Sequence, residues 1–384
     1  MTSYLLQNAA AVLPDGKLEN ANILIENGRI VSISPDKSRA DQIIDLSNQT
    51  LSAGFIDVHI HGAVGVDVNE ADADGLLLIA GFLARNGVTA WLPTLVPDSD
   101  ENYRRAIDAI DELMVAQVGQ PVAQAVGVHY EGVFANEKMC GALRSEYFLS
   151  GQWSVVSGQL PRLKTGLHVT TLAPEIDGGI ELIEAMVAEG WIVSIGHTRA
   201  DAKTLDRAYA AGARHLTHFF NAMTGVHHRD VGVAGWGLAN GGVTFDIIAD
   251  GIHVHPKMLG VACRAKSPDK VLLISDSVAP TGLGDGEFEL WGETITVKNG
   301  KTQNERGSIA GSVISMLDAV RMMRGIGFSD GEVSKMASAN PAKLLGLDNE
   351  RGSIEVGKRA DLVGLDEDGN VAFTMIGGEM VSRR

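Results

Sequence analysis

The chain has 384 residues, and its 45% hydrophobic content with 45 glycines is typical of a well-packed, loop-rich globular protein. A formal net charge of −16 argues against nucleic-acid binding, because nothing neutralises phosphates in bulk, although one small phosphate at a local basic spot is compatible with it. Cys140 and Cys263 are the only cysteines, and no apolar run approaches the roughly 18 residues of a membrane span. The sequence therefore predicts a cytoplasmic enzyme without a disulfide framework, a signal peptide or a membrane segment.

Both ends of the chain are predicted to form short strands and turns. Residues 21–33 contain the apolar runs ANILI and RIVSI around a Glu-Asn-Gly turn, which is a hairpin pattern. Residues 352–381 repeat short apolar runs separated by glycine turns. We expect residues 1–52 and 346–384 to meet in one small β-sandwich domain; two unrelated β appendages are the alternative.

Between these ends, residues 53–345 alternate between strand and helix patterns. Strands are predicted at 54–59, 88–95, 125–130, 168–173, 191–195, 215–219, 243–249 and 271–275. Helices are predicted at 76–86, 102–118, 180–189, 200–211 and 256–265, and a hairpin at 288–298 is followed by helices at 316–323 and 331–345. Eight strands with intervening helices predict an α/β fold, a (β/α)8 TIM-type barrel, which typically takes roughly 250 residues.

Metal-ligating or proton-handling side chains stand at or near the ends of six of these apolar runs. They belong to VHIH (58–61), HYEG (129–132), SIGH (194–197), LTH (216–218), DGIH (250–253) and ISD (274–276). Parallel barrel strands deliver such groups to one face, where the active site of this fold lies. Imidazoles and carboxylates at one point suit a hydrolytic metal, which needs ligands, an open water position and a base.

Individual positions differ in how specific their pattern is. His59 and His61 share one face of their strand and can chelate one cation, although an isolated His-x-His pair also occurs by accident. Glu131 ends an apolar strand, where a carboxylate is costly unless it binds a metal or forms a salt bridge. His197 and His218 are strand-end imidazoles suited to zinc. His129, His168 and His215 lie earlier in their strands and are expected to be core or supporting residues.

Two further features point to catalysis and anion binding. Asp276 closes the eighth strand and is not needed for a Glu/His/His set, so we interpret it as general base and then general acid, with a ligand role as the alternative. The segment 221–229 (NAMTGVHHR) places two imidazoles and Arg229 after the sixth strand. Arginine is suited to bidentate phosphate contacts, so an anion site is favoured over a solvated surface loop.

Taken together, these motifs resemble the N-acetylglucosamine-6-phosphate deacetylases of the amidohydrolase superfamily over nearly the whole chain. The ordered set is specific: GFIDVH (54–59), WLPT (91–94), HYEG (129–132), LAPE (172–175), GH (196–197), THFFNAM (217–223), IADGIH (248–253), Asp276 with Ala279-Pro280, Gly311-Ser312, NPA (340–342) and Leu345-Gly346.

The resemblance implies roles for these residues. Glu131, His197 and His218 would hold the principal divalent metal, zinc first and iron, cobalt or manganese as alternatives. His59 and His61 would allow a second ion, since members with Gln-x-Asn in this place use one. Asp276 would activate water and then protonate the departing amine. The 6-phosphate would be bound by Asn221 and Ala222 through backbone amides with Arg229, and His253 would touch the sugar. A homodimer is also implied. Beyond the resemblance, we expect His227 or His228, from this subunit or a neighbour, to help bind the phosphate.

This chain departs from the family pattern at one position. Where the family has Gly-x-His, residues 141–144 read GALR, so Leu143 stands at a substrate-binding position and cannot polarise a carbonyl. Either a metal acts alone as Lewis acid there or Arg144 reaches in. The predicted reaction converts N-acetyl-D-glucosamine 6-phosphate to D-glucosamine 6-phosphate and acetate.

Three other functions stay open. The segments 225–229 and 253–256 also resemble the N-acetylgalactosamine-6-phosphate deacetylases, which makes the 4-epimer an alternative substrate. A more distant alternative is an amidohydrolase acting on an unphosphorylated amide, against which the Arg229 loop speaks. A barrel that only binds sugars or scaffolds partners would leave the ligand set and Asp276 unexplained.

Overall fold

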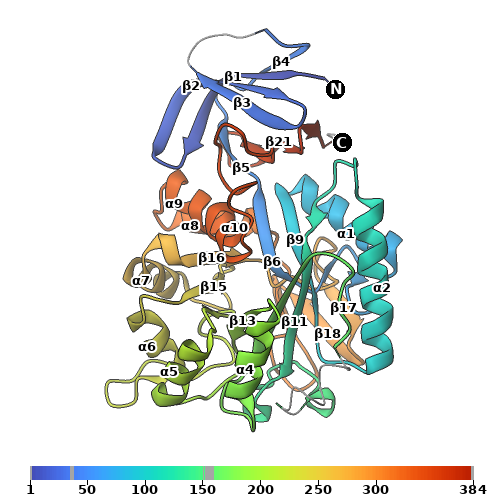
Figure 1. Cartoon of the computed structure of the whole chain (residues 1–384), viewed down its shortest axis with the longest axis vertical. Coiled ribbons are helices and arrows are strands. Elements are labelled where there is room, and N and C mark those ends of the chain that lie inside the picture. The colour runs from blue at the N-terminus through green and yellow to red at the C-terminus, as the bar shows by residue number, and fades with distance from the viewer. Residues whose placement is uncertain (1, 35–38, 150, 152–159, 382–384) are drawn as a thin grey trace.

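The computed structural model describes residues 2–34, 39–149, 151 and 160–381. Its centre is a nearly closed parallel barrel (Figure 1). The barrel strands are β6 (Phe55–Ile60), β9 (Val88–Leu95), β11 (Gly127–Phe134), β12 (Leu167–Leu172), β13 (Ile192–Ile195), β14 (His215–Leu216), β15 (Thr244–Ile248) and β16 (Val271–Ile274), and the short β10 (Gln124–Ala125) pairs with β9. Each of the eight barrel strands overlaps its predicted range, so the TIM-type barrel is confirmed.

The barrel closes where the first strand, β6, meets the last, β16. Just beyond β16, the Asp276 amide donates to His59 O at 2.9 Å, and the His61 amide donates to Ser277 O at 2.8 Å. Within the seam, the buried Asp57 carboxylate accepts a hydrogen bond from Ser275 Oγ at 2.5 Å. These contacts fix the segment that carries His59 and His61 against the segment that carries Asp276.

Helices cover the outside of the barrel, and local sequence signals explain where they begin. They are α1 (Ala73–Arg85), α2 (Asp100–Ala116), α4 (Gly179–Ala188), α5 (Ala202–Ala211), α6 (Gly232–Ala239), α7 (Pro256–Lys266) and α8 (Met316–Gly325). Asp72 and Ser99 cap the first turns of α1 and α2 by accepting backbone N–H bonds, and Ser315 with Asp318 forms a capping box at α8. No described helix is long and apolar enough to cross a membrane.

The predicted helix at 331–345 is divided into three pieces. It consists of α9 (Asp330–Ser334), the π-helical turn η4 (Lys335–Ala339) and α10 (Asn340–Leu344). Pro341 has no N–H to donate to the preceding turn, which disfavours regular α-helical pairing there. The Asn340 side chain instead donates to Pro268 O and Val271 O, and so ties this region to the start of β16.

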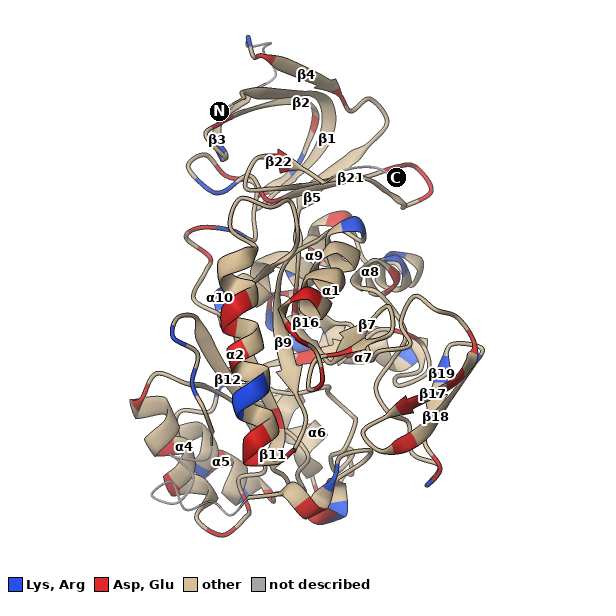
Figure 2. Cartoon of the chain, turned by 90° about the vertical axis from the view of Figure 1, so that its right-hand side faces the viewer, with Lys and Arg blue, Asp and Glu red and all other residues tan. Residues whose placement is uncertain are grey.

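Strands from both chain ends form one eight-stranded sheet, drawn at the top of Figures 1 and 2. Its strands are β1 (Tyr4–Leu13), β2 (Gly16–Glu26), β3 (Arg29–Ser34), β4 (Gln42–Asp45), β5 (Thr50–Ala53), β20 (Leu362–Leu365), β21 (Val371–Ile376) and β22 (Glu379–Met380). Antiparallel pairing of β5 with β20 joins the two ends, and Leu6, Leu51, Leu362 and Phe373 share its core. The division at 52/53 and 345/346 stays a prediction, and residues 1, 35–38 and 382–384 lie outside the described part.

A small antiparallel sheet follows the last barrel strand. It consists of β17 (Gly286–Leu290), β18 (Glu293–Lys298) and β19 (Lys301–Gln303), and it includes the hairpin predicted at 288–298. Figure 2 shows this sheet beside the barrel, below the sheet of the chain ends. The β17–β18 turn has Trp291 at its tip with a left-handed φ of 54°. A second hairpin, β7 (Gly62–Ala63) and β8 (Val66–Asp67), follows β6.

Candidate active site

Six predicted ligand or acid/base residues converge at the C-terminal end of the barrel. His59 lies in β6 and His61 directly after it, and Glu131 lies in β11. His197, His218 and Asp276 each stand two residues beyond the ends of β13, β14 and β16. All six side chains are buried. The parallel strands therefore bring together residues that are up to 217 positions apart in the sequence (Asp276 minus His59).

Three of these residues adopt a backbone conformation that non-glycine residues rarely adopt. The φ angles of His197, His218 and Asp276 are 48°, 33° and 49°, all in the left-handed region. Each residue lies two positions beyond the end of its strand, and its side chain joins one of the two groups of possible metal ligands. Strained backbone of this kind concentrates at functional sites, where the surrounding structure holds it in place.

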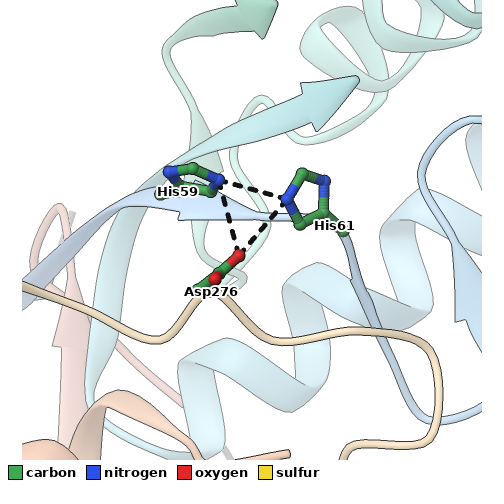
Figure 3. Close-up of side chains that lie close together, drawn as sticks. All are labelled: His59, His61 and Asp276. Atoms are coloured by element: carbon green, nitrogen blue, oxygen red, sulfur yellow. Dashed lines mark hydrogen bonds and ion pairs between the residues drawn. The ribbon is translucent and has the colours of Figure 1, made fainter. Parts of the chain in front are cut away.

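The first donor group consists of His59, His61 and Asp276, whose ligand atoms all lie within 4.8 Å of one another. Figure 3 shows the two imidazoles and the carboxylate pointing toward a common centre. His59 Nε2 lies 3.1 Å from His61 Nε2 and 3.4 Å from Asp276 Oδ1, and His61 Nε2 lies 3.3 Å from the same oxygen.

The second donor group consists of Glu131, His197 and His218. Glu131 Oε1 lies 3.0 Å from His197 Nε2 and 2.9 Å from His218 Nε2, and the two imidazole nitrogens are 3.0 Å apart. Glu131 also reaches the first group, since its Oε2 lies 3.2 Å from His61 Nε2. The two groups therefore form one continuous donor cluster with Glu131 between them.

The hydrogen bonds of the imidazoles test whether this cluster suits a metal. His197 Nδ1 faces Met139 O at 2.7 Å, and His61 Nδ1 faces Thr94 O at 3.2 Å. A carbonyl oxygen only accepts, so each Nδ1 donates and each neutral ring presents an Nε2 lone pair to Glu131. Two acceptors at about 3 Å repel unless a proton or a cation lies between them. The donor set of imidazole nitrogens and carboxylate oxygens fits a divalent metal such as zinc.

When no cation is bound, the carboxylates of the cluster favour protonation of the neighbouring imidazoles, and this effect shows in the pKa values. Burial alone lowers the pKa of His61, but hydrogen bonds to Asp276 and Glu131 and their charges raise it to about 10. Burial also lowers the pKa of His218, but the hydrogen bond with Glu131 and the charge of Glu131 raise that pKa to about 9. Although burial disfavours their charged forms, the neighbouring imidazoles hold the pKa of Glu131 and of Asp276 below the usual range. Both carboxylates are therefore ionised and ready to bind a cation.

The donor cluster opens into a cavity of about 280 Å³. Besides His61, Glu131, His197, His218 and Asp276, the cavity is lined by Gly141, Ala142, Leu143, Asn221, Ala222, His253, Trp291, Ser308, Ile309 and Gly311. This volume lies just below the range of about 300–1,000 Å³ that is typical of small-molecule pockets, so the cavity suits a small ligand better than a polymer.

The structure places the predicted substrate-binding residues in two locations. Asn221, Ala222, His253 and Leu143 line the cavity. Arg229 and His228 are exposed on the loop after β14, where Arg229 Nη1 lies 2.8 Å from His228 Nε2, and neither lines the cavity. The two residues predicted to bind the phosphate electrostatically are thus outside the cavity of their own chain.

Two expectations about this region need correction. Arg144 does not reach into the cavity, because its Nη2 donates to Asp98 Oδ2 at 2.7 Å and to Pro97 O at 2.9 Å. The backbone amide of Asn221 donates to His218 O at 2.9 Å, so it is already engaged within the turn.

The histidines expected to support the site are hydrogen-bonded in the interior. His129 lies between Val58 O at 3.2 Å and Thr171 Oγ1 at 2.7 Å, and burial with the nearby charge of His59 lowers its pKa well below the usual range. His215 Nε2 lies 2.9 Å from Asp246 Oδ2, while the other oxygen of Asp246 accepts from the His218 amide. These contacts orient the segments that carry the donor cluster.

Sequence reasoning assigned no role to two residues of the site, although Asp250 lies in the DGIH segment (250–253). Trp291 lines the cavity from the β17–β18 turn, and its ring lies 5.5 Å from that of His61 at 84°. A tryptophan at a hairpin tip, where a polar residue is expected, was the available signal. Asp250 accepts amide bonds from Ile252 and His253, and its Oδ2 lies 2.6 Å from His253 Nδ1, so it orients the imidazole that lines the cavity.

A parallel barrel with a buried cluster of imidazoles and carboxylates at its C-terminal end defines a metal-dependent barrel hydrolase. The family model described as "Amidohydrolase family" matches residues 50–381. An N-acetylglucosamine-6-phosphate deacetylase of Bacillus subtilis (strain 168) is 34% identical over 98% of this chain and 97% of its own. An N-acetylgalactosamine-6-phosphate deacetylase of Escherichia coli O157:H7 is 32% identical over 99% and 100%.

Solved structures agree with these sequence relatives. The crystal structure of N-acetylglucosamine-6-phosphate deacetylase from Pasteurella multocida superposes with a TM-score of 0.90 at 30% identity, covering 98% of this chain and 99% of that one. The chain belongs to the amidohydrolase family, in the branch that contains the N-acetylglucosamine-6-phosphate deacetylases.

Proposed function

We propose that this protein hydrolyses N-acetyl-D-glucosamine 6-phosphate to D-glucosamine 6-phosphate and acetate in amino-sugar catabolism. The observation that carries the proposal is the buried donor cluster, which includes Asp276 and lines a cavity of about 280 Å³. Full-length relatives with that activity in their names support the substrate class.

In this proposal, Glu131, His197 and His218 hold the principal divalent metal. His59 and His61, with Asp276 adjacent, provide donors for a second ion. Zinc suits this nitrogen and oxygen set, with iron, cobalt or manganese as alternatives. When bound, such a metal polarises a carbonyl and lowers the pKa of water.

Asp276 carries the proton in this proposal. Its pKa is held low by the nearby imidazoles, so its carboxylate can accept a proton from the attacking water. A carbon–oxygen bond to the acetyl carbon then forms, the carbon–nitrogen bond breaks, and Asp276 returns the proton to the departing nitrogen. The products are acetate and the free amine. The contacts that close the barrel, from the Asp276 amide to His59 O and from Ser275 to Asp57, hold the carboxylate in place.

The phosphate must be recognised by a local binding site, because a chain with a formal net charge of −16 repels a dianion at long range. Ala222 lines the cavity, whereas Arg229 and His228 are exposed nearby on the same connection. We therefore assign the phosphate to the Ala222 amide and the Asn221 turn, with Arg229 and His228 supplied by a neighbouring copy or by movement of the loop.

A homodimer fits this assignment. Val226 and Val231, which flank the basic loop, are exposed, and so are Met258 and Val261 on α7. Contiguous exposed apolar patches mark interaction surfaces, and we propose that these residues contribute to the contact between the two subunits. Sedimentation velocity should therefore give a dimer. We also propose a cytoplasmic location, which the free thiols of Cys140 and Cys263 support only as far as the sequence already did.

Replacing Arg229 with alanine should lower kcat/KM for the phosphorylated substrate selectively. Loss of a charged hydrogen-bond partner typically costs about 1.5–3 kcal/mol, or roughly 10- to 150-fold in kcat/KM. Efficiency on unphosphorylated N-acetylglucosamine should hardly change. Arg104→Ala, at an exposed arginine on α2, is the matched control. Equal losses on both substrates would instead give Arg229 a purely structural role.

The second candidate substrate is the 4-epimer, N-acetyl-D-galactosamine 6-phosphate, because a relative named for that activity aligns over the full length. The deciding experiment measures acetate release from both 6-phosphate epimers and from their unphosphorylated forms. We expect the gluco epimer to have the highest kcat/KM. A higher value for the galacto epimer would reassign the substrate, and a preference for either unphosphorylated sugar would overturn the 6-phosphate proposal.

A further inference from the structure

The cavity has an apolar side and a polar side. Ala142 and Leu143 follow β11, the third barrel strand, whereas Asn221, Ala222 and His253 follow β14 and β15, the sixth and seventh. In a closed barrel of eight strands the third and seventh lie opposite each other, so the two sides face one another across the cavity. The donor cluster lies between them.

Leu143 is held firmly on the apolar side. It is 4% exposed, and its amide donates to Cys140 O at 3.0 Å. Its side chain packs on Gly132, where a Cβ would come within 2.2 Å of Leu143 Cδ1. Gly132 has a left-handed φ of 69° and directly follows Glu131. Leu143 is therefore fixed beside the second donor group.

Trp291 continues the apolar side toward the first donor group. Its Nε1 donates to Asp67 Oδ2 at 3.0 Å, which fixes the indole, and its ring lies against His61. Trp291 and Ala142 pack against the same small apolar cluster, formed by Val278, Ala279, Leu290, Ile295 and Ala310. Leu143, Ala142 and Trp291 thus form one apolar wall, which flanks both donor groups.

We propose that this apolar wall, through Leu143 and Trp291, binds the N-acyl group of the substrate and limits its length to about that of acetyl. The inference rests on the proposed function. The scissile amide must lie beside the donor cluster and Asp276, and the hydroxyls and phosphate are best satisfied on the polar side. The methyl of the acyl group then faces the apolar wall, where its burial is favourable. Leu143 stands where the family has a histidine and cannot polarise the carbonyl of the substrate. In this chain it instead limits the length of the acyl group.

The test compares N-formyl, N-acetyl, N-propionyl and N-butyryl forms of the same amino-sugar 6-phosphate. Leu143→Ala should raise the butyryl-to-acetyl ratio of kcat/KM by about tenfold or more, because one methylene in a fitted pocket changes selectivity by about 10- to 200-fold. Leu143→Phe should shift the selectivity in the opposite direction, toward N-formyl. Leu163→Ala truncates a leucine of similar burial before β12, at the other end of the barrel, and should leave the ratios unchanged.

Trp291 is tested in the same way. Trp291→Ala should also raise the butyryl-to-acetyl ratio of kcat/KM. Trp291→Phe keeps an aromatic ring but loses the hydrogen bond to Asp67, and its ratio should stay close to that of the wild type.

The outcomes separate the inference from the function on which it rests. Acyl ratios within threefold of wild type in Leu143→Ala and Leu143→Phe, with normal deacetylation by the wild type, would overturn the inference alone. If Leu143→Ala does not fold, Leu143→Val should show a smaller shift in the same direction, and an unchanged ratio there would count equally against it. A wild type that releases no acyl group from any of the 6-phosphates would overturn both the function and the inference.

Discussion

Replacing His197 or His218 with alanine is expected to remove tightly bound metal together with nearly all hydrolysis. Each imidazole presents Nε2 to Glu131 at 3.0 Å or less, so each supplies one ligand to a shell of three protein donors. Changes to residues that merely orient a ligand typically cost about 10- to 100-fold in metal affinity or activity. Loss of the ligand itself should cost at least as much. Metal content by mass spectrometry, measured beside kcat/KM, gives the result.

His168→Ala is the matched control for a buried imidazole. His168 is 8% exposed, accepts from the Leu163 amide and packs on Trp191, outside the donor cluster. Its loss should affect stability but leave metal content intact. His59→Ala tests the number of bound ions. If the first donor group holds a metal, the substitution should lower the metal content by one ion, and otherwise the metal content should not change. Full metal content in both His197→Ala and His218→Ala would disprove their assignment as ligands.

The barrel could be predicted because each strand is a short apolar run that ends at a polar or glycine-rich segment. This pattern located all eight barrel strands and the hairpin after them. Strand direction then placed His59, Glu131 and His197 on one face, since parallel strands present their C-terminal ends together. Local pattern could not predict the interruption at η4, which depends on Pro341 and on the contacts of Asn340 with the start of β16.

The parts of the site that escaped prediction depend on long-range contacts. Trp291 reaches the cavity through a turn that is anchored on Asp67, more than 220 residues earlier in the chain. Arg144 was a candidate for the cavity, but Asp98 draws its guanidinium away. Arg229 follows a ligand-bearing strand, yet sequence adjacency does not determine which way the loop projects, and here its side chain is exposed.

Asp276→Asn is expected to keep the principal metal and substrate binding but to lose about 100- to 10,000-fold in kcat, the usual contribution of a general acid–base group. Asparagine nearly matches the shape of aspartate, so the buried turn with its φ of 49° should persist, because asparagine tolerates this conformation well. Its amide neither accepts the proton of the attacking water nor returns one to the amine. The pH profile supplies a second test. The imidazoles keep the pKa of Asp276 low, so the base is ionised at neutral pH and activity should fall as the pH drops through that low pKa.

Asp111→Asn provides the control, because Asp111 has the same 7% exposure as Asp276 but binds the Lys164 amide, away from the cavity. Metal analysis separates the two roles open to Asp276. Loss of one ion in Asp276→Asn would favour a ligand role in the first donor group, whereas unchanged metal with slow turnover would favour proton transfer. Turnover within threefold of wild type, about 0.65 kcal/mol on the transition-state scale, would place the base elsewhere. Glu131 is the other carboxylate whose side chain belongs to the donor cluster, so Glu131 would then be the group to test next.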